Sequence, residues 1–141
     1  IQDPRNFGAC LRVAECAGVT AVIFPNNNSA FFGSTLVKAS SGAIDNIPLI
    51  RVSNVCRALN ILKQQGVWIF GADGSATNSV YNSDLSRSMA LVVGNEGFGL
   101  KRLTQKSCDE LVSLPMSGSV SSLNVATATG IILFEANRQR I

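Results

Sequence analysis

The residues with the clearest chemical potential lie near the C-terminus, in the stretch 114–130. Its sequence, LPMSGSVSSLNVATATG, indicates a short strand, then a loop of small polar residues, then a helix. Because Ser and Gly bring little side-chain bulk, backbone N–H and C=O groups of this loop can reach a ligand directly. Ser121 or Ser122 is suited to cap the helix that follows. The stretch therefore predicts a ligand-binding loop at the end of a strand.

Two further motifs lie upstream, NFGACLR at 6–12 and VGNEGFGL at 93–100. The glycines of the second motif invite comparison with a dinucleotide-binding loop, but that loop has the spacing GxGxxG and follows the first strand. Here the glycines follow a late strand and their spacing is reversed. We interpret them as a loop whose backbone lies close to a nucleoside-like ligand; a tight strand-to-helix turn is the simpler alternative.

Composition excludes several classes of site. The 141 residues contain no histidine, which rules out Ser-His-Asp and Cys-His catalysis and histidine-based zinc sites. The four cysteines show no CxxC spacing and are expected to be reduced, mostly buried thiols. No apolar run approaches the roughly 20 residues that span a bilayer. The net charge of +3 permits an anionic partner without requiring one.

The elements that must position these motifs alternate between strands and helices. Short apolar runs predict strands at 21–24, 67–70, 91–93 and 111–114. Helical patterns cover 6–17, 53–65 and 123–138. Gly18 is the expected stop of the first, and the second has Ser53 as its expected cap and an apolar stripe of Val55, Ala58, Leu59 and Leu62. Residues 26–29 and 40–42 are predicted loops. This alternation predicts one α/β domain over residues 1–141, with a mainly parallel sheet and helices on both faces. The order of the strands does not follow from the pattern.

Taken in order and at this spacing, the three motifs resemble the signature motifs of the SpoU/TrmH family of RNA 2′-O-ribose methyltransferases, within the SPOUT superfamily. The segments DPRN at 3–6, IPLIRV at 47–52 and GSVSSLN at 118–124 strengthen the resemblance, which covers nearly the whole chain. The chain looks most like the members that modify a guanosine of bacterial 23S rRNA. The resemblance implies a SPOUT fold with a C-terminal trefoil knot. It also implies that a first strand and an upstream RNA-binding domain are absent from this sequence.

The resemblance further implies S-adenosylmethionine as methyl donor, with no metal. The cofactor site is expected to contain Gly94, Leu114 and Leu123, together with Ala72, Met116 and Ser122. The remaining partners expected are ribosomal RNA and a second copy of the chain in a homodimer, in the cytoplasm and away from membranes.

Four residues are expected to act in catalysis. Arg12 corresponds to the family's catalytic arginine, and it would orient a phosphate or stabilise the 2′-oxyanion, since guanidinium does not act as a base. Asn6 and Asn124 are expected to hold Arg12, Glu96 or the target ribose, and Glu96 to pair with an arginine.

Arg5, Arg51, Lys101 and Arg102 are candidate phosphate contacts. Two alternatives stay open: a related enzyme that modifies tRNA, and a knotted RNA-binding module without activity.

Overall fold

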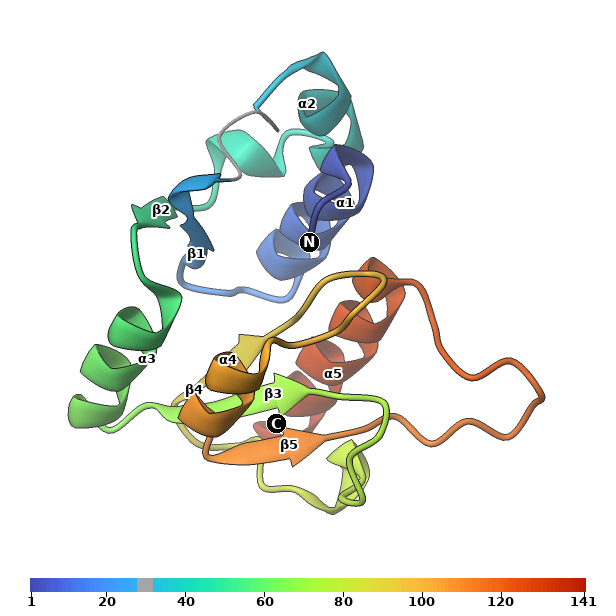
Figure 1. Ribbon diagram of the computed structural model, residues 1–141. Helices are drawn as coiled ribbons and strands as arrows, with labels where there is room; N and C mark the ends of the chain where they lie inside the picture. Colours follow the sequence, from blue (N-terminus) through green and yellow to red (C-terminus); the bar gives the residue numbers. More distant parts are fainter. Residues whose placement is uncertain (28–31) are drawn as a thin grey trace.

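Helices and strands alternate along the chain in the computed structural model, which describes residues 1–27 and 32–141 (Figure 1). In chain order the elements are α1 (Pro4–Cys16), β1 (Val22–Pro25), α2 (Ser34–Ser40), the 3₁₀ helix η2 (Ala43–Asp45), β2 (Leu49–Val52), α3 (Val55–Gln64), β3 (Trp68–Ala72), the 3₁₀ helix η3 (Val80–Asn82), β4 (Met89–Val92), α4 (Arg102–Ser107), β5 (Glu110–Val112) and α5 (Val125–Gln139). The α/β class is confirmed. Of the predicted loop 26–29, residues 28 and 29 lie outside the described residues.

The strands form two parallel sheets, which corrects the prediction of a single sheet. β1 pairs with β2, from Val22 opposite Leu49 to Pro25 opposite Val52. The other three strands follow the order β4-β3-β5, with β3 in the centre. Among the described residues, β1 and β4 each pair with a strand on one side only. Apolar runs identify buried strands but do not encode their neighbours, which is why the sequence did not reveal the division.

Helices cover both faces of the three-stranded sheet, which lies between α4 and α5 in Figure 1. On one face, Phe70 of β3 and Val112 of β5 join Ile132 of α5 in a buried cluster. On the other face, a side chain at Gly71 would collide with Leu100 and with atoms of the α4–β5 segment. Alternating residues of a strand point to opposite faces, so β3 is enclosed by both layers. The predicted arrangement of helices around a parallel sheet is confirmed for this sheet.

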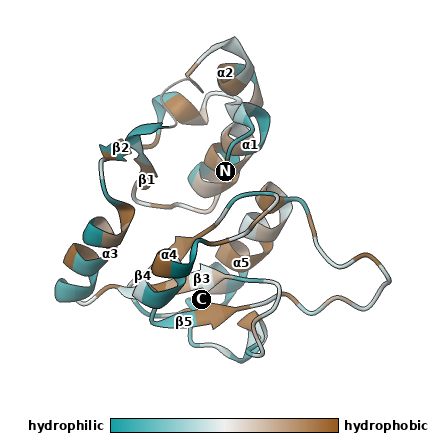
Figure 2. Ribbon diagram, in the orientation of Figure 1, coloured by the Kyte–Doolittle hydropathy of each residue, from teal (hydrophilic) through white to brown (hydrophobic). Residues whose placement is uncertain are grey.

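A second buried cluster holds the N-terminal part of the chain together. It combines Phe7 and Leu11 of α1 with Phe24 of β1 and Leu36 of α2. The two clusters are connected because α1 also packs against α5. Helices α3 and α4 carry hydrophilic and hydrophobic residues in alternation along the ribbon, as expected for helices with one face turned to solvent (Figure 2).

Helix termini correct the predicted caps. α1 begins after Asp3, whose carboxylate accepts from the Arg5 N–H, and the predicted stop at Gly18 is confirmed by its φ of +76°. For α3 the cap is Asn54 rather than Ser53. For α5 the cap is Asn124 rather than Ser121 or Ser122, and the helix begins at Val125.

The structure also adds elements that the sequence patterns missed: β2, α2 and α4. Helices α2 and α4 are too short to show a helical period, and Arg51 interrupts the apolar run of β2. The described cysteines are unpaired, as predicted, but only Cys10 is buried. None of the described helices has both the length and the apolar character needed to cross a membrane.

Candidate functional site

A cavity of about 560 Å³ opens where β3, β4 and β5 end and α5 begins. The carboxyl ends of parallel strands meet at one edge of a sheet, which is where such sheets bind ligands. The long segment between β5 and α5 extends from this edge (Figure 1). Except for Arg12, the residues expected at the site all line the cavity: Asn6, Ala72, Gly94, Glu96, Leu114, Met116, Ser122, Leu123 and Asn124.

Gly94 begins the cavity-lining loop after β4. A Cβ atom there would lie 2.2 Å from the carbonyl carbon of Gly99 and 2.5 Å from the Leu100 nitrogen. The two backbone segments touch because Asn95 and Gly99 exchange N–H···O bonds of 2.9 and 2.8 Å. Glycine is therefore required at 94 by backbone packing, in addition to any contact with a ligand.

A chain of hydrogen bonds connects the three motifs. The Asn124 Nδ2 atom donates to Asn6 Oδ1 at 2.9 Å, and Asn6 Nδ2 donates to Glu96 Oε1 at 3.1 Å. Asn124 Oδ1 meanwhile caps α5 by accepting from the backbone N–H groups of Ala126 and Thr127. The cap of α5 therefore also fixes the orientation of the amide that reaches Asn6.

Glu96 is held by several donors at one end of the cavity. Its carboxylate accepts from the backbone N–H groups of Gln2 at 3.0 Å and Asp3 at 3.3 Å, in addition to Asn6. Partial burial acts to raise the Glu96 pKa, but the hydrogen bonds from Gln2, from its own N–H, from Asn6 and from Asp3 outweigh it. The pKa therefore lies below the ordinary value, and Glu96 is an anion at neutral pH.

Arg12 lies apart from this network. It is exposed on α1, it does not line the cavity, and within the described part of the chain it has no ion-pair partner. The structure thus brings together Asn6, Glu96 and Asn124, and it leaves Arg12 outside. Glu96 makes no ion pair with an arginine among the described residues, and Asn6 takes the position beside its carboxylate.

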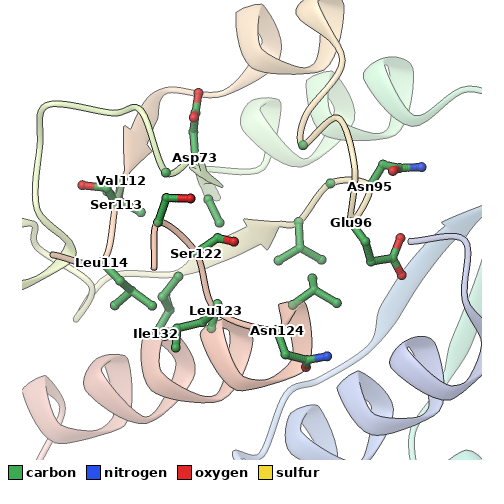
Figure 3. Close-up of a pocket in the computed structure, with 18 of the residues that line it drawn as sticks. Asp73, Asn95, Glu96, Val112, Ser113, Leu114, Ser122, Leu123, Asn124 and Ile132 are labelled. Atoms are coloured by element: carbon green, nitrogen blue, oxygen red, sulfur yellow. The ribbon is translucent and has the colours of Figure 1, made fainter. Parts of the chain in front are cut away.

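Apolar walls lie at the opposite end of the cavity from Glu96. Figure 3 shows Leu114, Leu123 and Ile132 grouped there, with Asn124 and Glu96 on the far side. Met116, Ser122 and Leu123 belong to the segment between β5 and α5, which has no regular structure and is largely exposed. This division suits a ligand with one apolar end and one polar end.

Sequence reasoning missed several lining residues, among them Asp73, Ser113 and Ile132. Asp73 follows β3 directly and accepts from the Ser75 N–H and hydroxyl at 2.9 and 2.8 Å. The signal was available, since an acidic residue just after a buried strand in a parallel sheet lies at the ligand-binding edge. Among the described residues there is no group of three or more Cys, Asp or Glu side chains that could hold a metal ion.

Comparisons with known proteins agree on one family. The family model for the SpoU rRNA Methylase family matches residues 1–134. The chain is 53% identical over 140 residues to the 23S rRNA (guanosine-2′-O-)-methyltransferase RlmB of Yersinia pestis, covering 99% of this chain and 57% of that protein. It is 52% identical over 140 residues to RlmB of Escherichia coli K12, covering 99% and 58%. The chain thus spans somewhat more than half the length of these relatives.

Solved structures show the same fold. The SpoU methyltransferase AviRb from Streptomyces viridochromogenes, in complex with the cofactor AdoMet, superposes with a TM-score of 0.91 at 30% identity, over 99% of this chain and 57% of that one. The A. aeolicus TrmH/SpoU tRNA modifying enzyme superposes with a TM-score of 0.89 at 29% identity, over 99% and 71%.

Proposed function

The chain belongs to the SpoU rRNA methylase family, and on that premise we propose that it catalyses methyl transfer from S-adenosylmethionine to a guanosine 2′-hydroxyl of bacterial 23S rRNA. The observation that carries the proposal is the cavity at the ends of β3, β4 and β5, where all three sequence motifs meet through Asn6, Glu96 and Asn124. The substrate follows the RlmB relatives, which are about half identical to this chain. Such a substrate implies a cytoplasmic enzyme.

The residues present fit the cofactor. A volume of about 560 Å³ lies within the usual range for small-molecule sites. Leu114 and Leu123 would enclose the adenine, and backbone groups of the segment from Met116 to Ser122 would bind its polar edge. Gly94 and Ala72 would border the remainder. When bound, the sulfonium supplies an already activated methyl group, so the protein mainly contributes position and electrostatics.

The contacts of the polar residues support a separate role for each of them. Asn6 and Asn124 are positioning residues, because each is fixed at both ends of its amide by the network that ends on Glu96. Glu96 lies at the polar end of the cavity, where its anionic oxygens would accept from a ribose hydroxyl. Arg12 would hold a phosphate of the target or stabilise the developing 2′-oxyanion, and the proton would leave through phosphate or water.

The position of Arg12 supports a shared active site. Because this side chain is exposed and lies outside the cavity of its own chain, we propose a two-fold homodimer in which it serves the cavity of the partner. The family resemblance also implies that the C-terminal segment threads through a loop as a trefoil knot, at the same edge of the sheet.

We further propose that this domain works with segments outside the sequence described here. All four residues of β4 are only half-buried, although the strand is apolar, and β4 and β1 each pair on one side among the described residues. A further parallel strand between them would bury both edges. An additional RNA-binding domain is consistent with relatives that are longer than this chain.

Transfer of a tritiated methyl group tests the activity. We expect the protein to label 23S rRNA and to leave tRNA unlabelled, with the label mapped by mass spectrometry to a guanosine 2′-O position. Labelling of tRNA alone would overturn the proposed substrate. Binding of RNA and S-adenosylmethionine without any transfer would identify an inactive RNA-binding module.

A further inference from the structure

Phe98 is the most exposed phenylalanine of the described chain, with 90% of its surface open to water. It lies in the loop between β4 and α4, two residues after Glu96. Its neighbours Gly97 and Gly99 line the cavity, whereas Phe98 itself does not. The ring is therefore presented at the rim of the candidate site, with both faces free of the protein.

Hydrogen bonds hold the backbone of the loop that carries this ring. Asn95 and Gly99 close the loop with two backbone hydrogen bonds, and Asn95 Oδ1 accepts from the Gly97 N–H at 2.7 Å and the Phe98 N–H at 3.4 Å. Gly99 adopts a φ of +67°, which turns the chain back at that point. A loop backbone that is ordered in advance loses little further conformational entropy when a ligand binds.

The surroundings favour an anionic partner with flat, apolar rings. Lys101 and Arg102 follow the loop, both are exposed, and neither has an ion-pair partner among residues 1–27 and 32–141. The acidic side chain closest in sequence, Glu96, is already occupied by three donors from the N-terminal segment. An aromatic ring beside unpaired cations matches a single-stranded nucleic acid, which offers bases to stack and phosphates to neutralise.

We propose that Phe98 is a stacking platform for an unpaired base of the substrate RNA at the rim of the methyl-transfer site, with Lys101 and Arg102 bound to the flanking phosphates. This inference rests on the proposed function, since it assumes that the cavity receives an RNA nucleoside. It makes the loop after β4 bifunctional: Gly94 and Glu96 belong to the cavity, and Phe98 faces the polynucleotide outside it.

Substitutions in the full-length protein separate the contribution of the Phe98 ring from that of the Lys101 and Arg102 charges. Binding of a 23S rRNA fragment is measured by fluorescence anisotropy over a range of salt concentrations. Phe98→Ala should bind on the order of tenfold more weakly, the scale of one lost base stack, with an unchanged salt slope. Phe98→Trp should retain the affinity. The double variant Lys101→Ala/Arg102→Ala should make the negative slope of log K against log salt shallower by about 1.4, because each phosphate contact contributes roughly 0.7 to that slope.

The matched control is Tyr81→Ala, which removes an exposed aromatic ring on η3 that does not line the cavity. Calorimetry should give the same affinity for S-adenosylmethionine in Phe98→Ala as in the wild type. Unchanged RNA affinity in Phe98→Ala would overturn the inference. It would also be overturned if sedimentation showed that Phe98→Ala alters the oligomeric state, since the ring would then serve a protein contact.

The two proposals fail differently. If the wild-type protein transfers no methyl group while Phe98→Ala still weakens RNA binding, the proposed function is wrong and the stacking platform is right. If the wild-type protein methylates RNA and Phe98→Ala binds RNA as tightly as the wild type, the platform is wrong and the function is right.

Discussion

Gly94 belongs to the loop that follows β4, and its lack of a side chain allows the backbone of Gly99 and Leu100 to pack against it. We expect Gly94→Ala to weaken S-adenosylmethionine binding at least about tenfold, because its Cβ would lie 2.2 Å from a backbone atom of Gly99. The collision involves backbone on both sides, so no rotamer change relieves it. Isothermal calorimetry measures the effect.

Gly74 provides the matched control. It also lines the cavity, but a Cβ atom there meets nothing within 4 Å. Gly74→Ala should therefore bind S-adenosylmethionine with nearly wild-type affinity. Equal affinities for Gly94→Ala and Gly74→Ala would contradict the importance of the loop closure.

Asn124 combines a structural and a positioning role that substitution can separate. Asn124→Asp keeps the oxygen that caps α5 but loses the amide donor to Asn6. Rotation of the Asn6 amide does not repair the network, because its oxygen would then face Glu96. We expect the free energy of unfolding of Asn124→Asp to lie within about 0.5 kcal/mol of the wild-type value, whereas its rate of methyl transfer should fall about 10- to 100-fold.

Asn124→Ala should lose the cap as well, so its free energy of unfolding should fall by about 0.5–2 kcal/mol. Urea denaturation and single-turnover methyl transfer provide the two readouts. Full activity in Asn124→Asp would show that the hydrogen bond between the two asparagines has no part in positioning.

At the scale of elements, the contact between α1 and α2 depends on Gly8. A Cβ there would lie 2.6 Å from the Ala39 Cβ and 2.8 Å from the Leu36 carbonyl oxygen. Gly8→Ala should destabilise the protein by about 1–3 kcal/mol, although alanine is the better helix former by roughly 0.5–1 kcal/mol. Adding Ala39→Gly should restore part of the loss. A higher denaturation midpoint for Gly8→Ala would contradict this packing.

The last turn of α5 gives a pH-dependent contribution. Hydrogen bonds from Arg138, then from Gln139, hold the pKa of Glu135 at about 2. A carboxylate whose pKa is lowered in the folded state stabilises that state fully above the ordinary pKa of 4.5. This stabilisation is lost as the pH falls toward 2. Arg138→Ala should therefore be less stable than the wild type at pH 7, with the difference vanishing near pH 2 in thermal melts.

Helices with a full period and strands with a continuous apolar run were predictable from sequence, whereas the short helices α2 and α4 and the interrupted strand β2 were not. The stripe of Val55, Leu59 and Leu62 identified α3, and apolar runs identified four of the strands. Caps were less predictable where several polar residues precede a helix, as Ser121, Ser122 and Asn124 precede α5. Asn124 caps α5 and also donates a hydrogen bond to Asn6, 118 positions away in the sequence, and local sequence does not reveal that contact.

On the scale of the whole molecule, the site was more predictable than the fold. Gly94 and Leu114 come at the ends of apolar runs, which points to one edge of a parallel sheet, whereas Leu123 was expected at the cavity only because the third motif resembles that of the family. Division into two sheets is a matter of which strands are neighbours, which the apolar pattern does not record. The sequence likewise placed Arg12 on the first helix, but it did not indicate that Arg12 lies outside the cavity.

The placement of Arg12 leads to a prediction about assembly. Arg12→Ala should fold and bind S-adenosylmethionine normally, since the side chain is exposed and does not line the cavity of its own chain, but methyl transfer should fall by roughly 10²-fold or more. Arg12→Lys should not restore the rate, because a point charge does not replace a planar donor.

Mixing two inactive variants tests whether the active site is shared. An Arg12→Ala chain retains its cavity, and a Gly94→Val chain retains Arg12. If Arg12 serves the partner's cavity, a mixed dimer contains one complete site, and random exchange places up to about half of the dimers in that form. Methyl transfer should then return to roughly a quarter of the wild-type rate. Each variant alone is the control, and a mixture no more active than its components would place Arg12 at the cavity of its own chain.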